Sequence, residues 1–108
     1  MLDDLEWLEL WYADQCRGDW AEDKGVMIES LDNPGWMLRV DLRGTALERR
    51  MKDALIHRSG EPPAEENGNL GGVEWMECTI KDGRFVGAGD PRKLRAILRC
   101  FRAWVEQE

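Results

Sequence analysis

Three cysteines and one histidine carry the most distinctive reactive groups in this sequence. Cys16, Cys78 and Cys100 are widely spaced, and His57 is the only imidazole of the chain. A zinc site needs closely spaced Cys or His pairs, and a secreted disulfide framework needs paired cysteines. A nucleophilic pair of Cys78 or Cys16 with His57 has no activating context in the sequence. We therefore expect three reduced, mostly buried cysteines and a histidine that is solvated or caps a helix.

Glycines and carboxylates do not supply a catalytic or cofactor site either. The Gly-Ala-Gly stretch at 87–89 lacks the GxGxxG spacing and the lysine of a phosphate-binding loop. The acidic stretch at 19–23 lacks the spaced ligands of an EF-hand. We predict no catalytic, cofactor-binding or metal-binding residue, and hence a protein that is not an enzyme.

Acidic residues are concentrated at the N-terminus. The chain has 108 residues and a net charge of −7, and residues 1–24 carry eight carboxylates against Arg17 and Lys24, a net charge of −6. An acidic surface with nearby aromatic side chains is typical of a protein that steers onto a basic partner, and nucleases are basic because their substrate is polyanionic. An ordinary solvated acidic face is the alternative that stays open. The predicted partner-binding residues are Trp7, Asp14, Asp19, Trp20, Glu22 and Asp23.

The C-terminal segment has the opposite charge. Residues 91–108 carry five cations against two carboxylates, a net charge of +3. Three interpretations are open for its arginines: a nucleic-acid-binding face, ion pairing with the acidic first helix, or solvated charge. The first interpretation makes a small nucleic-acid-binding regulator the alternative functional hypothesis. It ranks second because a net charge of −7 disfavours generic nucleic-acid binding. The arginines on one side of the expected helix are Arg92, Arg95, Arg99 and Arg102.

Hydrophobic periodicity predicts a helix over residues 2–16 and then a β-hairpin, with strands at 26–31 and 36–42 around a Pro-Gly turn. Trp7 and Leu10 lie outside the apolar stripe of this helix, so they either pack against a second element or form an exposed anchor. The stripe itself consists of Leu5, Leu8, Tyr12 and Cys16.

The second half of the chain predicts a helix, a hairpin and a helix. Thr45-Ala46-Leu47-Glu48 forms a capping box that would begin a helix extending to about His57. A second hairpin is expected around the Asp-Gly turn at 82–83, with alternation over residues 73–80. Asp90-Pro91 would cap the last helix as N-cap and N1. Its apolar stripe comprises Leu94, Ile97, Leu98, Phe101, Trp104 and Val105.

Together these elements predict a single α+β domain over residues 1–108. Their order is α-β-β-α-β-β-α, which implies a four-stranded, antiparallel sheet built from two hairpins, with the helices packed on one face. A mobile loop is expected at 59–72, a stretch rich in Gly, Pro and Glu. No apolar run is long enough to span a membrane, and the acidic start differs from a signal peptide, so a cytoplasmic location is expected.

Several motifs resemble the immunity protein 53 family. The N-terminal half carries Trp7-Leu8-x-x-Trp11-Tyr12 and Cys16-x-Gly18-Asp19-Trp20, and the most specific string is Leu31-Asp32-Asn33-Pro34-Gly35-Trp36. Phe85-x-Gly87-x-Gly89-x-Pro91 continues the resemblance, which runs from about Trp7 to Trp104.

The resemblance implies a cytoplasmic antidote of a bacterial polymorphic toxin system, encoded beside a toxin that it binds and neutralises. The expected partner is therefore the cognate toxin, for which a basic nuclease suits the charge of the chain. The resemblance assigns no toxin-contacting residues, and the oligomeric state is left open.

Overall fold

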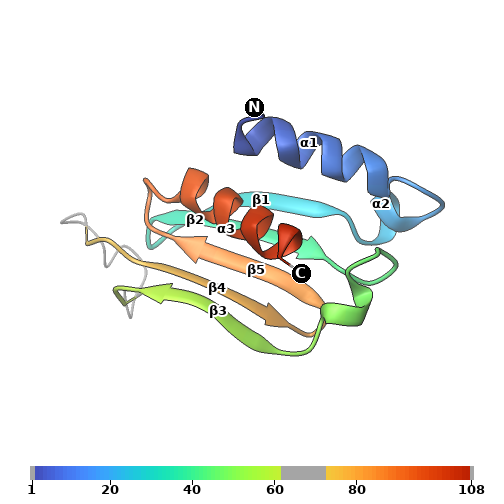
Figure 1. Cartoon of the computed structure of the whole chain (residues 1–108). Coiled ribbons are helices and arrows are strands. Elements are labelled where there is room, and N and C mark those ends of the chain that lie inside the picture. The colour runs from blue at the N-terminus through green and yellow to red at the C-terminus, as the bar shows by residue number, and fades with distance from the viewer. Residues whose placement is uncertain (1, 62–72, 108) are drawn as a thin grey trace.

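The computed structural model describes residues 2–61 and 73–107 of the chain. In chain order, the elements are α1 (Asp4–Gln15), α2 (Trp20–Asp23), β1 (Val26–Leu31), β2 (Gly35–Asp41), the 3-10 turn η1 (Glu48–Arg50), β3 (Ala54–Ser59), β4 (Met76–Lys81), β5 (Arg84–Gly89) and α3 (Leu94–Glu106). The five strands form one antiparallel sheet in the order β1-β2-β5-β4-β3 (Figure 1). The predicted α+β class is confirmed.

Both predicted hairpins are confirmed. β1 pairs with β2 across the turn that contains Pro34, and β4 pairs with β5 across Asp82 and Gly83. Asp82 has a φ of 52° and Gly83 a φ of 78°. Two consecutive positive φ values are typical of a type I′ turn, whose twist matches that of the two strands it joins.

The helix predicted from Thr45 to His57 is wrong. The capping side chains do form local bonds: Leu47 N donates to Thr45 Oγ1 over 3.1 Å, and Gly44 N donates to Glu48 Oε1 over 3.0 Å. These bonds hold only the short turn η1, after which the chain enters β3 and pairs with β4. The sheet therefore has five strands rather than four, and His57 lies on a strand, because tertiary pairing outweighs a weak helix propensity.

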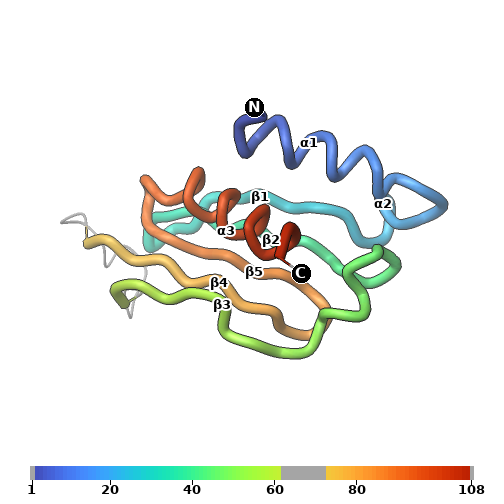
Figure 2. Tube along the Cα trace, viewed as in Figure 1, coloured from blue at the N-terminus to red at the C-terminus, as the bar shows by residue number. Residues whose placement is uncertain are grey.

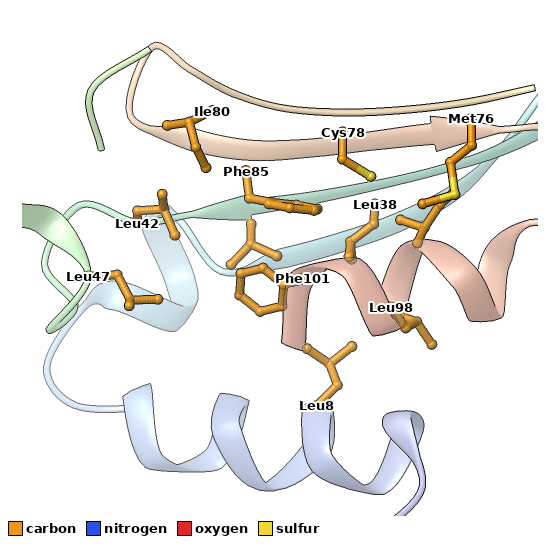
Figure 3. Packing of buried hydrophobic residues seen from close by; sticks show 12 residues of the cluster. Leu8, Leu38, Leu42, Leu47, Met76, Cys78, Ile80, Phe85, Leu98 and Phe101 are labelled. Carbon is orange, nitrogen blue, oxygen red and sulfur yellow. The ribbon is translucent and has the colours of Figure 1, made fainter. Parts of the chain in front are cut away.

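The core lies between the sheet and α3 (Figure 3). The predicted stripe of α3 is confirmed, with Ile97, Leu98 and Phe101 buried and its other members packed against the core. Gly87 allows the close approach of helix and sheet, because a Cβ at this position would lie 2.5 Å from Ile97 Cγ2. The strand residues of this core include Leu38, Val40, Cys78, Ile80 and Phe85.

Helix α1 packs beside α3 on the same face of the sheet (Figures 1 and 3). The ring centroids of Trp7 and Trp11 lie 5.8 and 5.2 Å from that of Phe101, and Leu8 is buried. Of the stripe that was predicted to be buried, only Leu8 is buried. The reason is that α1 is apolar on both sides, and the side that carries Trp7 and Trp11 packs on Phe101. The other members of that stripe are not buried: Leu5, Tyr12 and Cys16.

Asp90 does not cap α3 as predicted, because Lys93 is the N-cap residue. The buried Asp90 carboxylate accepts from Trp75 N over 2.8 Å and from Arg92 N over 3.0 Å. It also lies 2.9 Å from Lys93 Nζ. Burial alone would raise the pKa of Asp90, but the Lys93 and backbone hydrogen bonds lower it below its ordinary value. Asp90 therefore joins the start of β4 to the turn before α3.

The predicted loop at 59–72 falls mostly outside the described residues, which omit 62–72. Ser59, its first residue, ends β3. Within the part of the chain that the structure describes, no helix has the length and apolar character needed to cross a membrane.

Candidate protein-binding surface

The acidic N-terminal third is built from two helices joined by a sharp turn (Figure 2). Helix α1 ends at Gln15, and Gly18 has a φ of 56°, which suits glycine because it lacks a Cβ. The turn brings α2 back against the end of α1.

Trp20 fixes α2 to the rest of the fold. Its side chain is only 5% exposed, and its ring centroid lies 5.9 Å from that of Trp11 and 5.8 Å from that of Tyr12. Its indole Nε1 donates to Asp41 O at the end of β2 over 3.3 Å. The Trp20 ring thus packs beneath the exposed acidic residues of α2 and holds this helix in place. It is too buried to contact a partner.

Trp7, the other predicted aromatic contact, is half-buried and stacks beside Trp11 with a centroid distance of 6.4 Å. The Arg102 guanidinium lies over its ring, 5.8 Å from the centroid. Trp7 therefore joins α1 to α3.

The four carboxylates that were predicted to contact a partner are all exposed. Of the four, only Asp14 forms an ion pair among the described residues. Asp14 lies 3.7 Å from Arg17, in a pair whose side chains are both mostly exposed and which contributes little energy. Among the described residues, no Lys, Arg or His lies within ion-pair distance of Asp19, Glu22 or Asp23. These three carboxylates are therefore exposed and unpaired within the described part of the chain.

Two apolar side chains on the outer side of α1 are exposed: Leu10, for which an exposed anchor was one of the two predicted alternatives, and Leu5, which was predicted to lie in the buried stripe. Leu10 is 59% exposed and Leu5 is 55% exposed, while Glu6 and Glu9 between them are also exposed. A surface that mixes acid with exposed leucine is typical of an interaction site. The sequence does indicate this exposure: α1 carries apolar residues on both sides, and a helix that packs on one face cannot bury all of them.

The arginines of α3 partly neutralise the start of α1. Arg99 Nε lies 3.2 Å from Asp4 Oδ2, and Arg102 Nη1 lies 3.3 Å from Asp4 Oδ1. The interpretation of ion pairing with the first helix is therefore confirmed for these two arginines. Arg92 and Arg95 are exposed, and no described carboxylate lies within ion-pair distance of either.

Asp41 holds the end of β2 that supports Trp20. Its carboxylate accepts from Arg43 Nε over 2.9 Å and Nη2 over 2.7 Å, and Arg84 Nε lies 3.6 Å away. Burial alone would raise the pKa of Asp41. The hydrogen bonds from Arg43 and the charges of Arg43 and Arg84 instead lower this pKa below its ordinary value.

His57 lies opposite Cys78 in the pairing of β3 with β4, but no hydrogen bond joins His57 to a cysteine among the described residues. Cys78 is fully buried, Cys100 is half-buried and Cys16 is exposed, so the expectation of mostly buried cysteines fails for Cys16. A contact from Cys100 and burial raise the pKa of the Cys78 thiol, which therefore stays protonated. His57 is exposed on β3. Among the described residues, no three His, Cys, Asp or Glu side chains are grouped so as to hold a metal.

Comparison with known proteins yields one family. A family model described as Immunity protein 53 matches residues 5–106, which is nearly the whole chain. Searches of curated proteins and of solved structures return no match to the chain.

Proposed function

Because the chain belongs to the immunity protein 53 family, whose members protect against polymorphic toxins, we propose that it neutralises its cognate toxin through its acidic N-terminal surface. The proposed contacts are the carboxylates of Asp14, Asp19, Glu22 and Asp23, together with the exposed Leu10. Trp7 and Trp20 act beneath this surface by holding α1 and α2 in place. Immunity proteins are in general inhibitors rather than catalysts, and association alone is sufficient for this role.

One observation carries the proposal: the exposed carboxylates of Asp19, Glu22 and Asp23 lie at and within α2, and no described cation is within ion-pair distance of any of them. Such a patch raises the association rate with a positively charged surface, and a nearby apolar side chain slows dissociation once contact is made. A basic nuclease fits this surface best, because its own active-site region must attract a polyanion. We place the encounter in the bacterial cytoplasm.

The alternative of a nucleic-acid-binding regulator has less support. Arg99 and Arg102 already contact Asp4, which leaves Arg92, just before α3, and Arg95, within it, as the exposed arginines of this region that have no described ion pair. Two cations on a chain with a net charge of −7 form a weak electrostatic footprint for a phosphate backbone.

Co-expression with the toxin encoded by the neighbouring gene tests the proposed function. Cells that express the toxin alone should lose viability, and cells that also express this chain should recover it. A variant with Asp14, Asp19, Glu22 and Asp23 all changed to Lys should fold but protect poorly. If the wild-type chain gives no protection although it is soluble and abundant, the proposal is wrong.

A further inference from the structure

The two edge strands of the sheet are β1 and β3, and they differ in their backbone geometry. β1 pairs with β2 in an unbroken register from Val26↔Val40 to Leu31↔Gly35. The register of β3 against β4 shifts between Leu55 and His57, as at a β-bulge. Bulges are one device by which proteins block strand addition at an edge, and β1 has none.

The outward backbone groups of β1 follow from its hydrogen-bonding pattern. Asp41 N donates to Gly25 O over 3.1 Å, so these two residues form a hydrogen-bonded pair. Such pairs alternate along an antiparallel ladder, so Met27 and Glu29 also direct their N–H and C=O groups toward β2. Ile28 and Ser30, which lie between, therefore direct theirs away from the sheet.

The side chains along β1 are also accessible. Met27 is 42% exposed and Ile28 is 40% exposed, and they lie on opposite faces of the strand. Glu29 and Ser30 are exposed as well. A strand added at this edge would therefore gain backbone hydrogen bonds and apolar contacts on both faces of the sheet.

The charge around the two edges is opposite. Residues 19–32, which lead into and include β1, carry five carboxylates and the single cation Lys24. Within the described part of the chain, none of these five carboxylates forms an ion pair. Residues 49–59, which lead into and include β3, carry four Lys or Arg residues and one carboxylate, Asp53. Arg58 of β3 pairs with Glu77 of β4, so the unpaired cations at this edge precede the strand. A cationic chain is thus attracted to β1 more than to β3.

We infer that β1 receives an extended, basic segment of the cognate toxin as an added sixth strand of the sheet. This inference rests on the proposed function and specifies how the partner binds: main-chain hydrogen bonds to Ile28 and Ser30, with Lys or Arg side chains of the toxin near Glu29 and Asp23. A second copy of this chain does not suit the edge, because two copies would bring their unpaired carboxylates together.

Amide hydrogen exchange of the ¹⁵N-labelled chain tests the inference residue by residue. The probe is the toxin domain encoded by the neighbouring gene, inactivated by substitution in its active site. In the free protein, the Ile28 and Ser30 amides should exchange fast while the Met27 and Glu29 amides are already protected. In the complex, the Ile28 and Ser30 amides should slow by about a hundredfold, whereas the β3 amides keep their rates.

Three results would overturn the inference. If the toxin binds but the Ile28 and Ser30 amides stay fast, strand addition is wrong while the proposed function stands. If these amides become protected in the free protein as its concentration rises, the edge serves a second copy instead. If the toxin does not bind at all, the inference falls together with the proposed function.

A pair of variants provides a second test. Ser30→Pro removes an outward N–H from an edge strand, a position where proline leaves the pairing with β2 intact. Ser30→Ala keeps that N–H and is the matched control. Ser30→Pro should weaken toxin binding about tenfold, and Ser30→Ala should bind like the wild type. Equal affinities of two folded variants would contradict strand addition.

Discussion

Asp4 and Arg102 join the two ends of the chain: the Asp4 carboxylate on α1 lies 3.3 Å from Arg102 Nη1 on α3. Arg99 approaches the same carboxylate at 3.2 Å. The cations of α3 therefore pair with Asp4 in the first turn of α1. At the other end of α1, Asp14 has only the exposed Arg17 as a partner, and no described cation lies within ion-pair distance of the α2 carboxylates. The carboxylates of the proposed surface lie where α1 ends and α2 begins.

Replacing Asp4 should destabilise the fold without affecting toxin binding. Asp4→Asn removes the carboxylate that Arg99 and Arg102 share and leaves the partly buried Arg102 with Glu106 as its one described carboxylate partner, 3.5 Å away, so we expect a loss of about 1 kcal/mol in the free energy of unfolding. Urea denaturation measures this change, with Asp14→Asn as the control, because Asp14 forms only an exposed pair. Equal stabilities of the two variants would show that the contact between α1 and α3 is not energetically significant.

Trp20 should behave as a structural residue. Trp20→Phe keeps most of the packing and loses the hydrogen bond to Asp41 O, so we expect about 1 kcal/mol of destabilisation and nearly unchanged toxin affinity. Trp20→Ala should lose about 3–5 kcal/mol because it creates a cavity under α2. Calorimetric titration of Trp20→Phe with the toxin domain checks the claim, and a large loss of affinity in this well-folded variant would identify Trp20 as a direct contact.

The pH dependence of stability should report on Asp41. Its pKa is lowered in the folded state, so the unfolded chain binds more protons as the pH falls below about 4. The stabilisation is therefore complete above that pH and is lost as the pH falls through the lower folded pKa.

Asp41→Asn removes this contribution. We expect it to reduce the free energy of unfolding by about 1–3 kcal/mol at pH 7 and to make the decline below pH 4 shallower. Urea unfolding at pH 7 and pH 3 measures both effects. Asp19→Asn, at an exposed carboxylate without a described ion pair, should reproduce the wild-type curve, and a wild-type curve for Asp41→Asn would contradict the role assigned to the Arg43 contact.

Local sequence signals predicted the turns and the strongly amphipathic helix but not the extent of every element. Thr45 and Glu48 accept hydrogen bonds from Leu47 N and Gly44 N, which is not the predicted capping-box pattern. Only the short turn η1 forms, because the next residues gain more from pairing with β4 than from continuing a helix. This outcome depends on β4, which begins more than twenty residues after η1, and a local sequence pattern contains no information about so distant a strand.

Hydrophobic periodicity likewise could not predict which face of α1 packs against the core. Apolar residues occur on both sides of this helix, and the side that turns inward is decided by Phe101, which contacts Trp7 and Trp11. The acidic residues of the proposed site were predictable, because charge can be counted along a chain. The burial of Trp20 was not, because it depends on the end of β2.

The most direct test of the central claim is the association rate of the inactivated toxin domain with this chain at several salt concentrations. The wild type should associate fast at low salt and more slowly as salt is added. Changing Asp14, Asp19, Glu22 and Asp23 to Lys should slow association by about 10–100-fold at low salt, whereas changing Arg92 and Arg95 to Glu should not slow it. Equal effects of the two variants, or no association at low and moderate salt, would contradict the account.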